Sequence, residues 1–401
     1  MHVDLPRVRN LHGRGDPVKM SKTEGLLAPG TYFMMGNFAC VEAALIAGCR
    51  FYAGYPITPS SEIFERSCTR FPQAGGHAIE MEDEIASMAA LIGASYAGAK
   101  AMTATSGPGL SLMLENISLA YIMESPCVIV DVQRSGPCTG IPTLVGQGDM
   151  MQAKWGSGDI EAIAYSPSSV QEFFDLTIQA FNTAERFRTP VFILADQVIA
   201  MMWERLVVPS PEDVEIVERS VLDPSHMDSV PFDYSKDFLP MAVVGKGCKV
   251  NTDGLTHDMK GYPSTDHSAS ESMTSHLAGK IRNHANEIWK WEEYLTDDAD
   301  VIVVAYGSTA RSALSAVKMA REKGVKAALL RLITPWPFPD EVVQKLSSKV
   351  DAIVVPEINN GQMIHSVREN ANCSVVGVNW APGSLVDPGT IVDALEVVSS
   401  R

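Results

Sequence analysis

Short apolar runs alternate with longer amphipathic segments over two stretches of the chain. In the first stretch the predicted strands are 50–53, 100–105, 127–132 and 191–195. The predicted helices of the same stretch are 38–48, a segment that begins near 84, and 170–187. The strands lack the polar alternation of a sheet with one face in water. This pattern indicates a parallel sheet that helices cover on both faces.

The second stretch repeats the alternation of short strands with helices. Its predicted strands are the segments VIVVAY, KAALLRLI, DAIVVPE and SVVGV, and its predicted helices are 310–322, 340–346 and 362–370. Between the two stretches the pattern breaks, and residues 254–275 are rich in Ser, Thr, Asp, His and Gly, which is typical of a connector. We therefore expect an α/β protein with an N-terminal extension (1–29), a first domain (30–209), a connector (210–299) and a second domain (300–398).

Composition excludes several classes of partner. The chain has 401 residues, which is enough for two or three domains. Lysine and arginine total 32 against 48 aspartate and glutamate residues, and this acidic balance works against binding a nucleic-acid backbone. No apolar run approaches the roughly 18 residues that a membrane span needs, and the N-terminal segment has no apolar core. We expect a cytoplasmic protein that binds neither nucleic acid nor a membrane.

Cysteine and histidine spacing gives no metal site. The seven cysteines are scattered without any CxxC pair, so the chain carries no iron-sulfur or zinc signature of its own. His257, His267 and His276 lie in the polar stretch at spacings that match no ligand pattern, and we expect them to be solvated. Nucleotide motifs are missing as well, since neither GxGxxG after a strand nor GxxxxGK[ST] occurs.

An acidic run leads into the helix that begins near Glu84, and the segment TSGPG follows the next strand. Acids in a first turn complement the helix dipole, and a Gly-Pro-Gly turn can simply end a strand. The combination of Glu84, Gly93 nine residues later and TSGPG is more specific. It resembles the pyrimidine-binding domain of thiamine diphosphate enzymes, including the acetolactate synthase group. Glu82 and Glu80 lie two and four residues before Glu84, so a shift of the motif by two or four residues would place one of them in its role.

The segment GYPITPSS follows a predicted strand and contains two prolines. Pro56 fixes its own φ and restrains Tyr55, and Pro59 keeps Thr58 out of the α region. A rigid turn is one interpretation of this segment. The other is a binding loop that presents the Thr58 hydroxyl, because ligands of open parallel sheets bind beyond the carboxyl ends of the strands.

Arg134 follows the predicted strand 127–132 and opens the segment RSGPCTGIPT. A guanidinium offers paired donors in a planar fork and therefore suits a ligand carboxylate. An arginine that bridges two loops for structural reasons has the same sequence pattern.

In this order, the motifs GYPITPSSEI, EMEDEIASMAALIGASYAG and QRSGPCTGIPT resemble the alpha subunit of 2-oxoacid:ferredoxin oxidoreductases. Further similarity lies in LITPWPFPDE and PEINNGQM, and the resemblance covers about residues 30–398. It is closest to the 2-oxoglutarate branch, through AGYPITPSSEI, QRSGPCTGIPT and GLTHDMKG. The chain departs from the family at Phe38, where an acidic residue is usual, and at Cys138, where serine is common.

The resemblance implies a thiamine diphosphate enzyme that decarboxylates a 2-oxoacid, forms an acyl-CoA and reduces ferredoxin, or runs in reverse. For 2-oxoglutarate the product is succinyl-CoA. Residues 30–209 would form the pyrimidine-binding domain and residues 300–398 a transketolase C-terminal-like domain. A beta subunit would hold the diphosphate and Mg²⁺, while [4Fe-4S] clusters would lie only on partner subunits, among them gamma and ferredoxin-like delta subunits. The absence of a GDG motif with a later asparagine fits this division.

Carried over by motif, the resemblance implies five site residues. Glu84 would activate the pyrimidine, and Pro56 and Ile57 would also contact the cofactor. Thr58 would contact the reacting carboxylate or keto group, and Arg134 would pair with a substrate carboxylate. Two alternatives stay open at this point: the same chemistry on branched-chain 2-oxoacids or pyruvate, and a non-catalytic assembly subunit.

Overall fold

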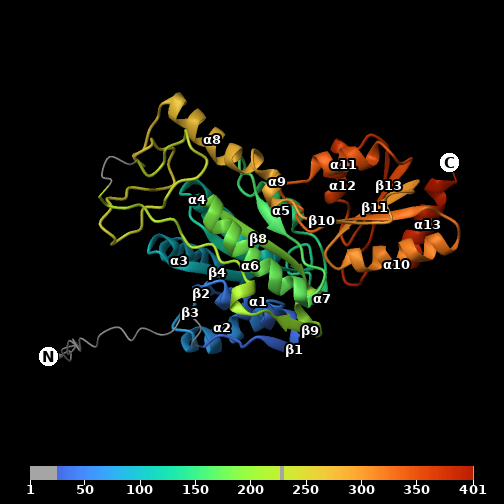
Figure 1. Ribbon diagram of the computed structural model, residues 1–401, viewed down its shortest axis with the longest axis horizontal. Helices are drawn as coiled ribbons and strands as arrows, with labels where there is room; N and C mark the ends of the chain where they lie inside the picture. Colours follow the sequence, from blue (N-terminus) through green and yellow to red (C-terminus); the bar gives the residue numbers. More distant parts are fainter. Residues whose placement is uncertain (1–24, 226–229, 401) are drawn as a thin grey trace, which may run out of the picture.

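The computed structural model describes residues 25–225 and 230–400, and it contains two α/β units that lie end to end (Figure 1). Each unit is built on a mainly parallel sheet, so the predicted fold class is confirmed. The predicted extension 1–29 falls almost wholly outside the described residues. Within the described part of the chain, no helix is long and apolar enough to cross a membrane.

The first unit contains a seven-stranded sheet with the strand order β3-β2-β4-β5-β8-β7, and β6 pairs with β5 beside this path. The strands are β2 (Cys49–Gly54), β3 (His77–Glu80), β4 (Lys100–Thr105), β5 (Cys127–Ser135), β6 (Ile141–Val145), β7 (Ile163–Tyr165) and β8 (Pro190–Asp196). All neighbours are parallel except β6, which runs antiparallel to the end of β5.

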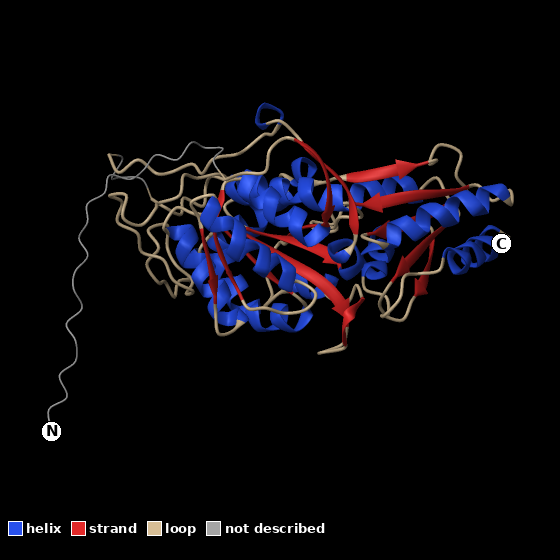
Figure 2. Cartoon of the chain, turned by 90° about the horizontal axis from the view of Figure 1, so that it is seen from below, coloured by secondary structure: helices blue, strands red, loops and turns tan. Residues whose placement is uncertain are grey.

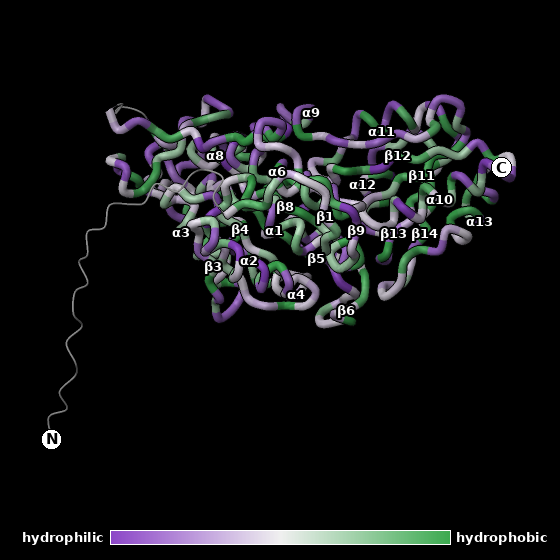
Figure 3. The backbone as a smooth tube through the Cα atoms, turned by 60° about the horizontal axis from the view of Figure 1, so that its bottom comes forward, coloured by the Kyte–Doolittle hydropathy of each residue, from purple (hydrophilic) through white to green (hydrophobic). Residues whose placement is uncertain are grey.

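Helices cover both faces of this sheet, because its strands are apolar on both sides. The helices are α1 (Gly36–Ile46), α2 (Ser61–Gln73), α3 (Glu84–Tyr96), α4 (Gly107–Ile122), α5 (Met150–Trp155), α6 (Val170–Phe187) and α7 (Gln197–Met201). Along β5, Val128, Val130 and Val132 belong to the core under α1 and α6, while Cys127 and Ile129 belong to the core under α3 and α4. Figure 3 shows the hydrophobic segments running through the strands of both units.

A two-stranded ribbon closes the first unit. Strand β1 (Gly30–Met35) pairs antiparallel with β9 (Trp203–Val208) over its whole length, from Gly30 opposite Val208 to Met35 opposite Trp203. The segment that enters this unit and the segment that leaves it therefore lie side by side.

The second unit has the strand order β10-β12-β11-β13-β14. Its strands are β10 (Trp291–Tyr294), β11 (Val301–Tyr306), β12 (Ala327–Leu332), β13 (Ala352–Glu357) and β14 (Ser374–Asn379). Its helices are α10 (Thr309–Glu322), α11 (Asp340–Ser347), α12 (Met363–Asn370) and α13 (Pro388–Ser399). The strand β10 is antiparallel to β12 and lies inside the segment predicted as connector, so this sheet is mixed at one edge.

The remaining connector packs against the first unit. Its loops gather at one end of the molecule (Figure 2), and α8 (His267–Arg282) runs from them toward the second unit, where the short helix α9 (Ala285–Ile288) follows. A one-turn 3₁₀ helix, Pro211–Asp213, lies near the start of the connector. The helix α8 was not predicted, because its sequence is rich in Ser, Thr and His, which have modest helix propensity.

Buried charges hold α8 in place. Glu124, two residues after the end of α4, accepts hydrogen bonds from Lys280 Nζ (2.6 Å) and His276 Nε2 (2.9 Å). Burial alone would raise the pKa of Glu124, but the charges of Lys280 and Arg188 lower it overall. The ion pair fixes the helix onto the first unit, and leaving any partner alone in this buried place would be costly.

The prediction that three connector histidines are solvated is wrong for two of them. His267 is exposed, but His276 is 5% exposed and bonds Glu124, and His257 is fully buried. His257 contacts Tyr234 Oη through Nδ1 (2.8 Å) and donates from Nε2 to the Ile122 carbonyl (3.2 Å). The partners lie far away in sequence, so local composition could not reveal them.

A buried polar junction joins the two units. Asp196, at the end of β8, accepts from the backbone N–H of Ser308 (2.6 Å) and from Gln147 Nε2 (3.0 Å). Gln147 Oε1 accepts from Thr309 Oγ1 (2.9 Å) and from the N–H of Ile358 (3.1 Å). These groups are fully or almost fully buried. The loop around Gln147 is thereby pinned to the start of α10 and to the end of β13.

Replacing Asp196 with alanine is expected to destabilise this junction. The change leaves the buried Ser308 N–H without its acceptor and leaves Gln147 Nε2 with only a long hydrogen bond to the Tyr306 carbonyl (3.4 Å), and we expect a loss of about 2–4 kcal/mol in the free energy of unfolding. Urea unfolding of the purified chain measures the loss. The exposed Asp213→Ala is the control and should change stability by less than about 0.5 kcal/mol. Equal stability of the two variants would contradict the role of the junction.

Candidate active site

Three loops of the first unit meet where parallel strands end. They follow β2, β3 and β4, which are neighbours in the sheet, and the end of β5 lies next to them. Ligands of open parallel sheets bind outside the carboxyl ends of the strands. All of the sequence-predicted site residues lie at this edge.

Glu84 is the buried acid of the acidic run. It begins α3 and is 4% exposed, whereas Glu80 and Glu82 are exposed. Asp83 caps the helix by accepting a hydrogen bond from the N–H of Ala86 (2.7 Å), so the start of α3 is fixed. The sequence left three glutamates as candidates for the motif position, Glu80, Glu82 and Glu84. Glu84 is the one whose side chain is buried.

Gly109 makes room for the Glu84 carboxyl. A Cβ atom at Gly109 would lie 2.4 Å from Glu84 Oε1 and 2.0 Å from Thr105 Oγ1. The segment predicted as a Gly-Pro-Gly turn is in fact the first turn of α4, which begins directly at Gly107. The glycine is therefore required by close approach to a side chain rather than by a turn.

The environment of Glu84 raises the pKa of its carboxyl group. Burial is the largest cause that raises the pKa of Glu84, and the neighbouring charge of Asp83 adds to it, while the charge of Arg134 opposes it. A carboxyl group with a raised pKa can share a proton with a weakly basic partner. The direction of this shift makes Glu84 a candidate for proton exchange with a ligand.

Arg134 connects the Thr58 loop to the same edge. Strand β5 continues to Ser135, so Arg134 lies within the strand rather than after it. Its side chain is largely buried, and Nη1 donates to the Thr58 carbonyl (2.7 Å). Its Nε has no hydrogen-bond partner among the described residues. Arg134 thus bridges two loops, as the structural interpretation of the sequence required.

The Thr58 loop presents its side chains outward. Thr58 and Pro56 are exposed and Ile57 is half-buried. The loop is held from behind, since Asn37 Nδ2 donates to the Pro59 carbonyl (2.9 Å) and Ser60 Oγ donates to the Ile57 carbonyl (2.9 Å). The structure therefore brings the Thr58 loop, Glu84 and Arg134 to one edge of the sheet.

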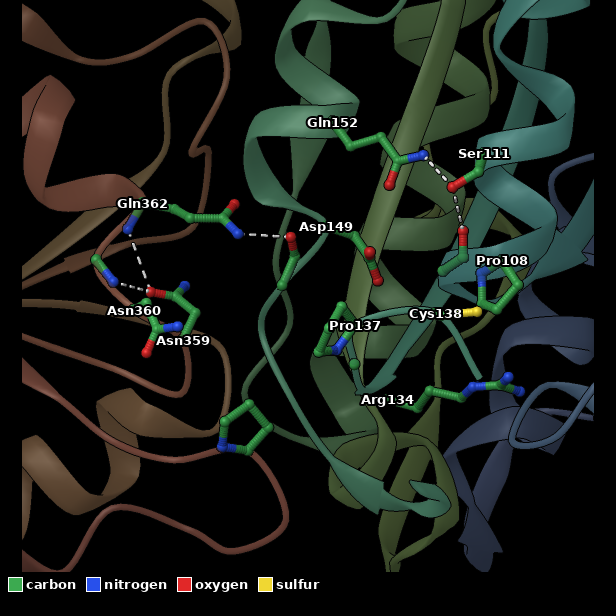
Figure 4. Close-up of a pocket in the computed structure, with 15 residues that line it drawn as sticks. Pro108, Ser111, Arg134, Pro137, Cys138, Asp149, Gln152, Asn359, Asn360 and Gln362 are labelled. Atoms are coloured by element: carbon green, nitrogen blue, oxygen red, sulfur yellow. Dashed lines mark hydrogen bonds between the residues drawn. The ribbon is translucent and has the colours of Figure 1, made fainter. Parts of the chain in front are cut away.

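A cavity of about 390 Å³ lies between the two units and is open to solvent (Figure 4). Arg134 lines it, together with the first turns of α4, the turn after β5 and the start of α5. The second unit contributes residues 359–362 from the end of β13, which belong to the PEINNGQM segment. Glu84 and Thr58 do not line this cavity, so Arg134 belongs both to it and to the edge with Glu84.

Sequence reasoning missed two acids near Arg134, one buried and one half-buried. Asp131 lies inside the apolar strand β5 and is fully buried, and Asp149 immediately precedes α5 and lines the cavity. A lone aspartate inside the apolar run CVIVDV was the available signal, because an acid in such a strand is costly to bury and needs a reason. In the described part of the chain, no group of three or more His, Cys, Asp or Glu side chains is arranged to hold a metal ion.

Comparison with known proteins connects this geometry to a family. The family described as "Pyruvate flavodoxin/ferredoxin oxidoreductase, thiamine diP-bdg" matches residues 42–276, and "Pyruvate:ferredoxin oxidoreductase core domain II" matches residues 299–388.

Curated relatives match over most of their length. The chain is 50% identical over 337 residues to the 2-oxoglutarate synthase subunit KorA of Methanocaldococcus jannaschii, which covers 84% of this chain and 90% of that protein. It is 36% identical over 375 residues to the ketoisovalerate oxidoreductase subunit VorB of Methanothermobacter thermautotrophicus, which covers 92% of this chain and 98% of that protein.

One similar solved structure is the 2-oxoglutarate:ferredoxin oxidoreductase from Magnetococcus marinus with 2-oxoglutarate, coenzyme A and succinyl-CoA bound. The TM-score is 0.85 at 32% sequence identity, and the match covers 92% of this chain. The chain spans 65% of the length of that relative.

Replacing Gly109 with alanine is expected to displace the Glu84 carboxyl. The added Cβ would overlap Thr105 Oγ1 and Glu84 Oε1, and we expect a loss of about 1–3 kcal/mol in the free energy of unfolding. A crystal structure of the variant and its urea unfolding curve measure both effects. Gly279→Ala in α8 is the control, because its Cβ would meet only Asn283 Nδ2 at 3.7 Å. An undisturbed Glu84 in the Gly109 variant would refute the packing argument.

Proposed function

The chain belongs to the pyruvate flavodoxin/ferredoxin oxidoreductase family, and from this premise we propose that it is the catalytic alpha subunit of a thiamine diphosphate-dependent 2-oxoglutarate:ferredoxin oxidoreductase. The reaction converts 2-oxoglutarate, CoA and two oxidised ferredoxins into succinyl-CoA, CO₂, a proton and two reduced ferredoxins, or runs in reverse. The observation that carries the proposal is the buried Glu84 carboxyl beside Arg134 at the strand ends.

The residues at this edge suit the pyrimidine end of thiamine diphosphate. When bound, the cofactor supplies the carbon nucleophile that attacks the keto group of the substrate. Glu84 would hold a proton against a ring nitrogen of the pyrimidine, since its carboxyl is buried and its pKa is raised. Pro56 and Ile57 would contact the cofactor from the loop after β2. This assignment rests on the Glu84 environment and on the motif order.

Arg134 and Thr58 are the proposed substrate residues. The Arg134 guanidinium lines the cavity and is held in place through the Thr58 carbonyl, so it would meet a substrate carboxylate in a fixed orientation. The exposed Thr58 hydroxyl can donate to the reacting carboxylate or the keto oxygen.

The other half of the active site is proposed to come from a beta subunit that holds the diphosphate and Mg²⁺. The chain has no GDG motif for that task. On the elements that meet at the Glu84 edge, exposed large apolar side chains include Tyr55 after β2, Ile85 on α3 and Leu112 on α4. Exposed apolar side chains on these elements suit a permanent protein contact. The [4Fe-4S] clusters and the ferredoxin contact would belong to partner subunits, among them gamma and delta.

The second candidate function is the same chemistry on branched-chain 2-oxoacids. The 36% identity to a ketoisovalerate oxidoreductase subunit supports it, and the higher identity to 2-oxoglutarate synthase subunits, between 42% and 50%, favours 2-oxoglutarate. A non-catalytic assembly subunit is disfavoured, because a scaffold gains nothing from burying the Glu84 carboxyl.

Replacing Glu84 with glutamine is expected to lower kcat by at least about 100-fold, because the amide cannot exchange a proton with the cofactor. CoA-dependent viologen reduction by the anaerobic complex measures kcat, and size-exclusion chromatography checks that the subunits stay together. The matched control is the exposed Glu82→Gln, which should behave like the wild type. Unchanged turnover in the Glu84 variant would favour the assembly role.

Replacing Arg134 with lysine is expected to raise KM for the 2-oxoacid by roughly 10-fold to 100-fold, because lysine cannot offer paired donors. The assay compares 2-oxoglutarate, pyruvate and 2-oxoisovalerate with and without added thiamine diphosphate. The exposed Arg282→Lys is the control. A wild-type preference for another 2-oxoacid would leave the family role intact and overturn the substrate, whereas activity without the cofactor would overturn both.

A further inference from the structure

We propose that His284 is a latch that fastens residues 235–239 of the connector to α9 when its imidazole is protonated and releases them when the imidazole is neutral. His284 immediately precedes α9, the short helix that leads into β10 of the second unit. The inference goes beyond the proposed function, because it concerns the joint between the connector and the two units rather than the candidate active site.

Both ring nitrogens of His284 face carboxylate oxygens. Nε2 lies 3.0 Å from Asp237 Oδ2 of the connector, and Nδ1 lies 2.8 Å from Glu287 Oε1 of α9. An ionised carboxylate only accepts hydrogen bonds, and a neutral imidazole has one donor nitrogen and one acceptor nitrogen. Both contacts are therefore hydrogen bonds only when His284 carries two ring protons and a positive charge.

The two carboxyl groups keep contact with water. The side chain of Asp237 is 40% exposed and that of Glu287 is 39% exposed. Carboxyl groups in such contact with water are ionised near neutral pH, so neither supplies a proton to the contact. The protonation state of the imidazole therefore decides whether both hydrogen bonds exist at once.

The hydrogen bond between His284 and Asp237 is the polar attachment of residues 235–239. Among the described residues, no other hydrogen bond joins this segment to a helix or strand. The remaining bonds of Ser235 and Lys236 run to Asp233, which lies in the same loop. Loss of the His284 bond therefore removes the polar anchor of the segment.

An apolar contact accompanies the latch. The ring of Phe238 packs on the imidazole, with 4.7 Å between the ring centroids, and on Phe187 at the end of α6, with 5.3 Å between the centroids. Phe238 is 39% exposed, so its release uncovers little apolar surface. Asp237 also lines a cavity of about 640 Å³ beside α8, and the latch therefore fixes part of the wall of that cavity.

The charges that face the latch come from four elements. Arg186, in the last turn of α6, is ion-paired with Glu287, and Lys280 of α8 is within electrostatic reach of Asp237. The hydrogen bond to Glu287 is the largest cause that raises the pKa of His284, and the bond to Asp237 adds to it, while burial opposes both. The hydrogen bond from His284 in turn lowers the pKa of Glu287.

These directions set the pH at which the latch works. A histidine whose pKa is raised in the folded chain is protonated below its ordinary value of about 6.5, and it loses its proton as the pH rises through the raised value. The latch is therefore closed in mildly acidic solution and opens on the alkaline side of pH 6.5.

The first measurement is an NMR titration of the full chain with ¹³C-labelled histidine, in which His284→Gln assigns the resonance. His284 is expected to titrate above about pH 6.5. Asp237→Asn and Glu287→Gln are each expected to lower this midpoint, because each removes one acceptor of the protonated ring. The exposed His365 of α12 is the internal control and should titrate at the same pH in every variant.

The second measurement is the rate of trypsin cleavage after the exposed Lys236. This rate in the full chain, divided by the rate in a free peptide of residues 230–242, is expected to rise about 2-fold to 5-fold between pH 6.5 and pH 8.5. His284→Gln cannot be protonated and is expected to give the faster ratio at both pH values. The matched control His365→Gln should keep the wild-type rise.

Three results would overturn the inference. One is a wild-type His284 that titrates at or below about pH 6.5, a measurement that needs no comparison between variants. The others are a wild-type cleavage ratio that is equal at both pH values, and a rise that persists in His284→Gln shown by circular dichroism to be folded. Neither thiamine diphosphate nor a 2-oxoacid takes part in these measurements, so their failure would leave the proposed function standing.

Discussion

The buried side chain of Gln147 is the constraint on which the candidate site depends. Its amide nitrogen donates to Asp196 of the first unit, while its amide oxygen accepts from Thr309 and Ile358 of the second. The loop that carries Gln147 continues directly into Asp149, so the same bonds fix one wall of the cavity relative to the other. A polar cluster of this kind specifies one arrangement of the units, because any other arrangement leaves buried donors without acceptors.

At the strand ends, burial and the charge of Arg134 have opposite effects on the pKa of the nearby acids. The charge of Arg134 lowers the pKa of three neighbouring acids, Glu84, Asp131 and Asp149. Burial raises the pKa of each of these acids and is the largest cause in each case, so the charge of Arg134 offsets only part of that effect.

Sequence patterns predicted elements well where apolar runs have clear ends. The bounds of β4 and α6 agree with the prediction because each is an apolar or amphipathic run with sharp polar limits. Prediction failed where long-range contacts decide: β10 is four residues of mostly polar sequence, and α8 depends on Glu124, which lies 156 residues from Lys280. At the site, motifs pointed to Glu84 and Arg134, but Asp149 was missed because the fold, rather than a local pattern, brings the start of α5 to the cavity that Arg134 lines.

The ribbon formed by β1 and β9 brings the entrance and the exit of the first unit to one place. A unit whose two ends are adjacent can be joined to other segments at either end without breaking its sheet or its core. The architecture of the first unit therefore suits its use as one module that is joined to different neighbouring segments in different chains.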